Sequence, residues 1–168
     1  MVDFPLYYEM TQLYPAELAF GRDVLKLIHL KLGVKLPDDE AGAIALHAVA
    51  HLMEDGQAGV GEAMAFTQVM KVALDEVRKA TGRDIALGDS AVARFVTHMR
   101  YLFGRLRSSK KIQSEPDEIV NAIEQSLERS WAIAGTVVDT VHDYTGMTLG
   151  KSERAYIALH IGRLLHGD

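Results

Sequence analysis

The chain has 168 residues, of which 48% are hydrophobic, and it carries a formal net charge of −5 and no cysteine. This composition supports one large domain or two small ones with a hydrophobic core, and it excludes disulfides, thiolate nucleophiles and cysteine zinc sites. The acidic balance argues against nucleic-acid binding by this chain, the lack of a long apolar run argues against a membrane-spanning helix, and the lack of cysteine fits a cytoplasmic location.

The first third of the chain reads as three helices followed by a break. Apolar residues recur at three- and four-residue spacing with glycine and proline at the segment ends, which predicts an all-α fold with helices at about 6–13, 15–32 and 37–53. Pro37 is expected to open the third helix, with acidic residues in its first turn, where the helix dipole favours negative charge. The polar stretch 55–59 contains two glycines and is the expected linker.

The remainder reads as five further helices, at about 62–81, 90–107, 116–125, 128–144 and 151–165. Gly82 and Gly146 are the expected ends of two of them, and Asp89 or Ser90 is the expected N-cap of the helix that follows. Polar and basic residues over 108–114 predict a loop between the second and third of these helices.

A tandem repeat underlies this pattern. The segment Ile44–His47 recurs as Ile157–His160, an offset of 113 residues. The same ungapped register pairs Ala19 with Ala132, Val24 with Val137, His29 with His142, Gly33 with Gly146, Leu36 with Leu149 and Glu40 with Glu153. Because helix ends coincide as well, we expect two copies of one helical unit.

The repeat also predicts how the chain is divided. Residues 62–113 have no counterpart in the first copy, so 1–57 is expected to be the C-terminal part of one unit, truncated at its N-terminus, and 58–168 a complete second unit. A partial unit leaves an apolar face uncovered, and we therefore expect a partner surface, such as that of a homodimer.

Three histidines are the candidate functional residues. His47 and His160 occupy equivalent repeat positions, and His98 lies on the helix at 90–107. A neutral imidazole is available as a nucleophile near pH 7 and can accept a phosphoryl group. Arg94 precedes His98 by four residues and Arg163 follows His160 by three, which places each arginine on the same helix face as a histidine, where it could hold a phosphate.

Other interpretations of the histidines remain open. Any of them can be a packed or hydrogen-bonded side chain, and His29 and His142, on stretches expected to be half-exposed, are assigned a structural role. His47 and His51 have the one-turn spacing of two metal ligands, but the repeat partner of His51 is Leu164, and a zinc site needs further ligands. No nucleophile elbow or phosphate-binding loop is present, so we expect no enzyme activity, cofactor or metal.

Several stretches resemble one known family. Leu13–Pro15, Leu32–His47, Arg94–His98 and Tyr156–Ile161 are similar to the PTS regulation domain, or PRD, of BglG/SacY/LicT-type transcriptional antiterminators. The resemblance covers nearly the whole chain and is most specific over the stretch through His47. It implies tandem PRD helical bundles, each with two phosphorylatable histidines: His47 as the second of the first PRD, and His98 and His160 as the pair of the second.

The resemblance also implies a mechanism. A sugar-specific enzyme II of the bacterial phosphotransferase system inactivates the regulator through the first PRD, and the carrier HPr phosphorylates the second and favours an active dimer. RNA would be bound only through a separate N-terminal domain. Three other functions stay open. One is the PRD module of a DNA-binding activator of the same system, and another, from a different class, is a helical metal-binding protein using His47 and His51. A pure dimerisation module with histidines in its core is a third.

Overall fold

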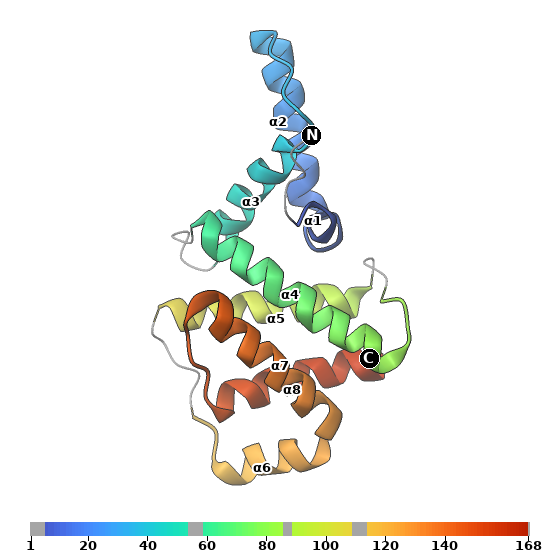
Figure 1. The fold of residues 1–168 in the computed structure, drawn as a ribbon, viewed down its shortest axis with the longest axis vertical. Coiled ribbons are helices and arrows are strands. Elements are labelled where there is room, and N and C mark those ends of the chain that lie inside the picture. Colours follow the sequence, from blue (N-terminus) through green and yellow to red (C-terminus); the bar gives the residue numbers. More distant parts are fainter. Residues whose placement is uncertain (1–5, 54–58, 86–88, 109–113, 168) are drawn as a thin grey trace. The chain divides into compact units, whose positions relative to one another are not determined.

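The computed structural model describes residues 6–53, 59–85, 89–108 and 114–167, and these residues form helices joined by turns and loops, with no strand (Figure 1). The chain divides into two compact units, Met1–Thr67 and Gln68–Asp168. Within the described ranges, no helix combines the length and hydropathy needed to cross a bilayer. Most of the expected linker at 55–59 and of the expected loop at 108–114 lies outside the described residues.

The first unit is built on a pair of helices that lie against each other, α2 and α3. It contains α1 (Tyr7–Leu13), α2 (Pro15–Leu32), α3 (Glu40–Leu52) and the first part of α4 (Val60–Thr81). Its core includes Met10, Tyr14 and Phe66, which are fully buried. The Tyr14 hydroxyl lies 2.9 Å from the Thr67 hydroxyl, so the polar end of this buried tyrosine has a partner on α4.

In the second unit, α8 packs against several other helices. The unit contains the rest of α4, then α5 (Ser90–Arg107), α6 (Asp117–Ser126), α7 (Glu128–Thr145) and α8 (Lys151–His166). Helix α8 packs against α5, α6 and α7, and Ile157 and Ile161 on it are fully buried. The expected N-cap of α5 is confirmed, because the Asp89 carboxylate accepts a hydrogen bond of 3.0 Å from the Ala91 amide.

The repeat is visible in the helix boundaries. Helix α2 covers Pro15–Leu32 and α7 covers Glu128–Thr145, the same 18 positions at the offset of 113 residues. Both helices end at a glycine in the left-handed region, Gly33 with φ 70° and Gly146 with φ 71°. Glycine has no Cβ to oppose this conformation, which is why both helices end where the sequence predicts.

The expected start of α3 at Pro37 is wrong. The chain first makes a tighter turn, in which the amides of Glu40 and Gly42 bond to the carbonyls three residues earlier, and α3 begins only at Glu40. In the second unit, Glu153 accepts a hydrogen bond of 2.9 Å from the Gly150 amide and fastens the first turn of α8. Proline has no amide hydrogen, so Glu40 cannot make the equivalent bond to Pro37.

Candidate functional site

A pocket of about 290 Å³ lies between α5 and α8 of the second unit. Its lining consists of Ala91, Arg94, Phe95 and His98 from α5 and His160 and Arg163 from α8. Four of the five candidate residues predicted from the sequence therefore meet in one place: two histidines and the two arginines expected to stabilise a phosphate.

Helical periodicity explains how these side chains reach the pocket. Residues three, four and seven positions apart share a helix face, so Ala91, Arg94 and His98 face α8 together. Phe95, next to Arg94, is 2% exposed and fixes the rotation of α5. On α8, His160 and Arg163 share a face in the same way, and the buried neighbours of His160 anchor that helix.

The two histidine rings are stacked. The ring centroids of His98 and His160 lie 4.0 Å apart with an interplanar angle of 21°. The rings of Tyr156 and His160 meet in a T-shaped contact at a centroid distance of 4.5 Å. His160 is thus enclosed between an imidazole and a phenol ring, whereas His98 is only half-buried.

This enclosure changes the acid–base chemistry of His160. The side chain is 9% exposed, and burial, with smaller contributions from His98 and the Arg163 charge, lowers the pKa of His160 from 6.5 to about 4. Burial acts in this direction because it disfavours the charged imidazolium. At neutral pH the ring is therefore uncharged and retains one nitrogen with a free lone pair.

Two guanidinium groups stand at the rim of the pocket. Arg94 and Arg163 are both exposed, and the Arg163 charge lowers the pKa of His160, which indicates that its field reaches the ring. A phosphate on either imidazole would lie within reach of cations that bind such groups through charge-assisted hydrogen bonds. The arrangement combines a neutral nitrogen nucleophile, His160, with a positively charged rim, as acceptance of an anionic group requires.

His47 does not line this pocket. It is exposed on α3 in the first unit, although it is the repeat counterpart of the enclosed His160. The difference follows from the neighbours: α5 covers His160, and the described part of the first unit contains no counterpart of α5. His51 is likewise exposed, and the described residues contain no group of three or more metal-ligating side chains.

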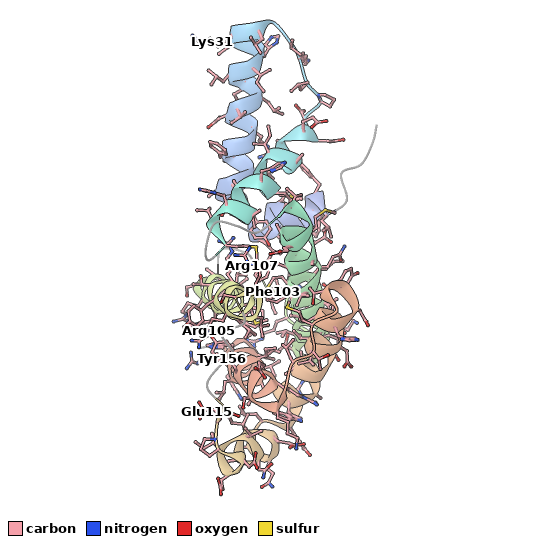
Figure 2. The ribbon with its side chains drawn as sticks, turned by 90° about the vertical axis from the view of Figure 1, so that its left-hand side faces the viewer. Lys31, Phe103, Arg105, Arg107, Glu115 and Tyr156 are labelled. Carbon is pink, nitrogen blue, oxygen red and sulfur yellow. The ribbon has the colours of Figure 1, made fainter. Side chains whose placement is uncertain are left out.

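Tyr156 is the site residue that sequence reasoning did not single out. Tyr156, which is labelled in Figure 2, lies on α8 one turn before His160, and the rings of the two residues are in contact. Its hydroxyl lies 3.5 Å from both the Nδ1 atom and the carbonyl oxygen of His98. The four-residue spacing within Tyr156–His160 was the available signal, but it does not tell which residue of another helix the hydroxyl reaches.

His29 and His142 are both exposed, and their structural role stays a prediction. Each lines a shallow pocket of its own unit, and the two pockets are formed largely by repeat-equivalent residues. The pocket at His29 includes three cations, Arg22, Lys26 and Lys35, and one carboxylate, Asp38, whereas the charged residues of the pocket at His142 are Asp139 and Asp143. The duplicated surface thus differs in charge between the units, and neither histidine is held by a packed environment.

Comparison with known proteins identifies the family. The PRD domain model matches residues 1–51 and 71–164. The chain is 33% identical over 159 residues to a beta-glucoside operon antiterminator of Dickeya chrysanthemi, covering 95% of this chain and 55% of that protein. It is 29% identical over 161 residues to the transcription antiterminator LicT of Bacillus subtilis, covering 95% and 57%, respectively.

A third relative agrees with these two. The transcription antiterminator LacT of Lacticaseibacillus casei is 29% identical over 157 residues, which cover 91% of this chain and 53% of that protein. The chain thus spans a little over half the length of the relatives it matches. The matched PRD segments include all the candidate residues on α3, α5 and α8. The chain therefore belongs to the PRD domain family.

Proposed function

We propose that this chain is the regulatory part of a transcription antiterminator, controlled by phosphorylation of histidines by the bacterial sugar phosphotransferase system. His47, His98 and His160 are the acceptors, HPr and a sugar-specific enzyme II are the donors, and Arg94 and Arg163 hold the phosphate at the second unit. RNA is bound by a domain outside this chain, in a cytoplasmic protein. The phosphate shifts an equilibrium between two states of a homodimer.

The observation that carries this proposal is the stacked pair of His98 and His160 in a pocket that Arg94 and Arg163 also line. Adding a dianionic phosphate to either ring would place about two negative charges within reach of Arg94 and Arg163. It would also introduce bulk and charge between α5 and α8, where the rings are now only 4.0 Å apart. Phosphorylation therefore has a direct way to change how these two helices pack.

The relatives favour RNA over DNA as the target of the whole protein. All three are named antiterminators, and none is named a DNA-binding activator. The proposed organisation keeps 1–57 as the C-terminal part of a first PRD and 58–168 as a second. Two separately matched segments support it, since 1–51 falls within the first and 71–164 within the second.

Exposed apolar side chains of the first unit support the homodimer. Phe20 and Leu27 are each 55% exposed and Leu30 is 79% exposed, whereas Ile133, the repeat counterpart of Phe20, is 7% exposed. Large apolar residues gathered on one helix are typical of a surface that a partner covers. Light scattering is expected to give the mass of a dimer, and Leu30→Glu should shift it towards the monomer. A wild-type monomer at high concentration would contradict this part.

The decisive experiment is phosphorylation in vitro. The chain is incubated with phosphoenolpyruvate, enzyme I and HPr, and intact mass is read under mildly basic conditions that preserve phosphohistidine. We expect about one or two added phosphates that are lost in acid. His98→Ala/His160→Ala abolishes this HPr-dependent gain, whereas His142→Ala, an exposed histidine of the same unit, retains it. Full labelling of the double variant would refute the assignment of sites.

Arg94 provides a second test of the same pocket. Arg94→Ala removes one of the two cations at the rim, and we expect the yield of phosphate on the second unit to fall about threefold or more, as loss of a charge-assisted hydrogen bond would produce. Arg22→Ala, which removes an exposed arginine of the first unit, is the control and leaves the HPr-dependent yield unchanged. Equal yields for both variants would show that Arg94 does not hold the phosphate.

A further inference from the structure

The hydroxyl of Tyr156 connects α8 to the acceptor histidine of α5. It lies 3.5 Å from the carbonyl oxygen of His98, to which it donates, and 3.5 Å from the Nδ1 atom of the same residue. The ring of Tyr156 is in T-shaped contact with the His160 ring, which restrains the position of the hydroxyl. The contact therefore places one hydrogen-bonding group beside one particular nitrogen of His98.

Only one arrangement of protons satisfies both contacts of this hydroxyl. A phenol hydroxyl has a single proton, and a carbonyl oxygen can only accept a hydrogen bond. Once the proton of Tyr156 is directed to the carbonyl of His98, its oxygen can only accept from the imidazole, which requires hydrogen on Nδ1. A neutral imidazole carries one N–H, so the lone pair of His98 is then on Nε2. Burial also raises the pKa of Tyr156, which keeps the hydroxyl protonated.

We propose that Tyr156 is a positioning residue that holds His98 in the tautomer with hydrogen on Nδ1, so that Nε2 is the nitrogen that accepts the phosphoryl group. The first half of this inference, the tautomer of His98, is independent of the proposed function. The second half, transfer of the phosphoryl group to Nε2, rests on it. The donor is a phosphoramidate, namely the phosphohistidine of the carrier protein. The Nε2 lone pair forms the new N–P bond, the donor N–P bond breaks, and its electron pair returns to the donor nitrogen. The proton on Nδ1 stays in contact with the Tyr156 oxygen.

The repeat supplies a comparison within the same chain. The position equivalent to Tyr156 in the first unit is Ala43, at the offset of 113 residues, so the helix that carries His47 has no phenol at this place. His47 itself is exposed. The tautomer control is thus a property of the second unit, and His47 serves as an internal reference in any measurement on the whole chain.

The tautomer can be measured without any phosphorylation. Side-chain ¹⁵N NMR of the whole chain at about pH 8, where an ordinary histidine is neutral, distinguishes the nitrogen that carries hydrogen from the one that carries the lone pair. We expect His98 with hydrogen on Nδ1 in the wild type. Tyr156→Phe keeps the ring against His160 and removes only the hydroxyl. The ratio of the Nδ1–H form to the Nε2–H form should then fall about fivefold, which is the effect of losing one neutral hydrogen bond.

Tyr144→Phe is the matched control, because Tyr144 is an exposed tyrosine of the same unit and should leave the His98 signals unchanged. Labelling with phosphoenolpyruvate, enzyme I and HPr then tests the second half of the inference. We expect phosphate on Nε2 of His98 in the wild type and a lower initial rate in Tyr156→Phe, in proportion to the measured population of the Nδ1–H form and therefore at most about fivefold lower.

Different results would refute different statements. A wild-type His98 with hydrogen on Nε2, or a tautomer ratio that Tyr156→Phe leaves unchanged, overturns the inference. Phosphate on Nδ1 of His98 overturns its second half. A wild-type chain with the expected tautomer that accepts no phosphate from active HPr refutes the proposed function instead, while the tautomer assignment stands on the NMR measurement.

Discussion

The low pKa of His160 predicts that the second unit becomes less stable as the pH falls below neutrality. In the unfolded chain this imidazole takes up a proton near pH 6.5, but in the folded chain it does so only near pH 4, chiefly because it is buried. Between these values the unfolded state binds more protons than the folded state, so acid favours unfolding. His160→Gln replaces the ring by a neutral side chain and should remove this part of the pH dependence.

The size of the effect follows from the two pKa values. One unit of difference corresponds to about 1.4 kcal/mol, and the unfolded state is largely unprotonated at about pH 7. From about pH 7 to about pH 5, the wild type therefore loses about 2 kcal/mol of its free energy of unfolding through this residue. The loss continues until about pH 4, the folded-state value. Among the described residues, the titratable and charged groups that face His160 are His98, Arg94, Arg163 and Tyr156, and none of these is a carboxylate that would reverse the sign.

Trp131 makes the measurement specific to one unit. It is the only tryptophan of the chain, lies in the second unit and is 8% exposed, so its fluorescence reports the unfolding of that unit. Urea unfolding at the two pH values gives the free energies. His160→Gln should show about 2 kcal/mol less pH dependence than the wild type, and His142→Gln, which changes an exposed histidine, should match the wild type. Equal pH dependence in all three proteins would refute the explanation by burial.

Two further predictions concern helix packing and capping. Gly21→Ala should destabilise the first unit by about 2 kcal/mol in thermal unfolding followed by circular dichroism, because a Cβ there would collide with the backbone carbonyl of Ala41 and force α2 away from α3. Gly135→Ala is the comparison: its Cβ meets only the far end of the Arg154 side chain, so a loss below about 1 kcal/mol is expected, and equal losses would argue against the close helix contact. Asp89→Ala removes the hydrogen bond that begins α5 and should cost about 1 kcal/mol, seen as faster hydrogen exchange in the first turn of that helix; unchanged exchange would contradict this role.

The all-α fold and most helix ends could be predicted from the sequence, because local chemistry determines them. Gly33 and Gly146 end equivalent helices in a conformation that glycine adopts readily, and the α5 cap at Asp89 is a hydrogen bond between near neighbours in sequence. The start of α3 could not be predicted as well. Pro37 suits the first turn of a helix, but the missing amide also removes a bond that α8 has, and the two effects oppose each other.

Residue spacing alone could not predict that the candidate residues of α5 and α8 come together in one pocket. Periodicity places Arg94 beside His98 and Arg163 beside His160, but the stacking of the two rings depends on how α5 and α8 pack. The same limit applies to burial. His47 and His160 end the same four-residue sequence, yet only His160 is enclosed, because its surroundings come from a different helix. The contact of Tyr156 with His98 has the same origin.

The pockets at His29 and His142 show which positions of the repeated helices can change without changing the fold. Lys26 occupies the place that Asp139 has in the other unit, a reversal of charge on an exposed face, while the helices around both positions keep the same boundaries. The backbone therefore carries either sign at this place without a change of architecture. An engineer could exchange these charges between the two copies to redirect which surfaces attract one another, and could do so without redesigning a single helix.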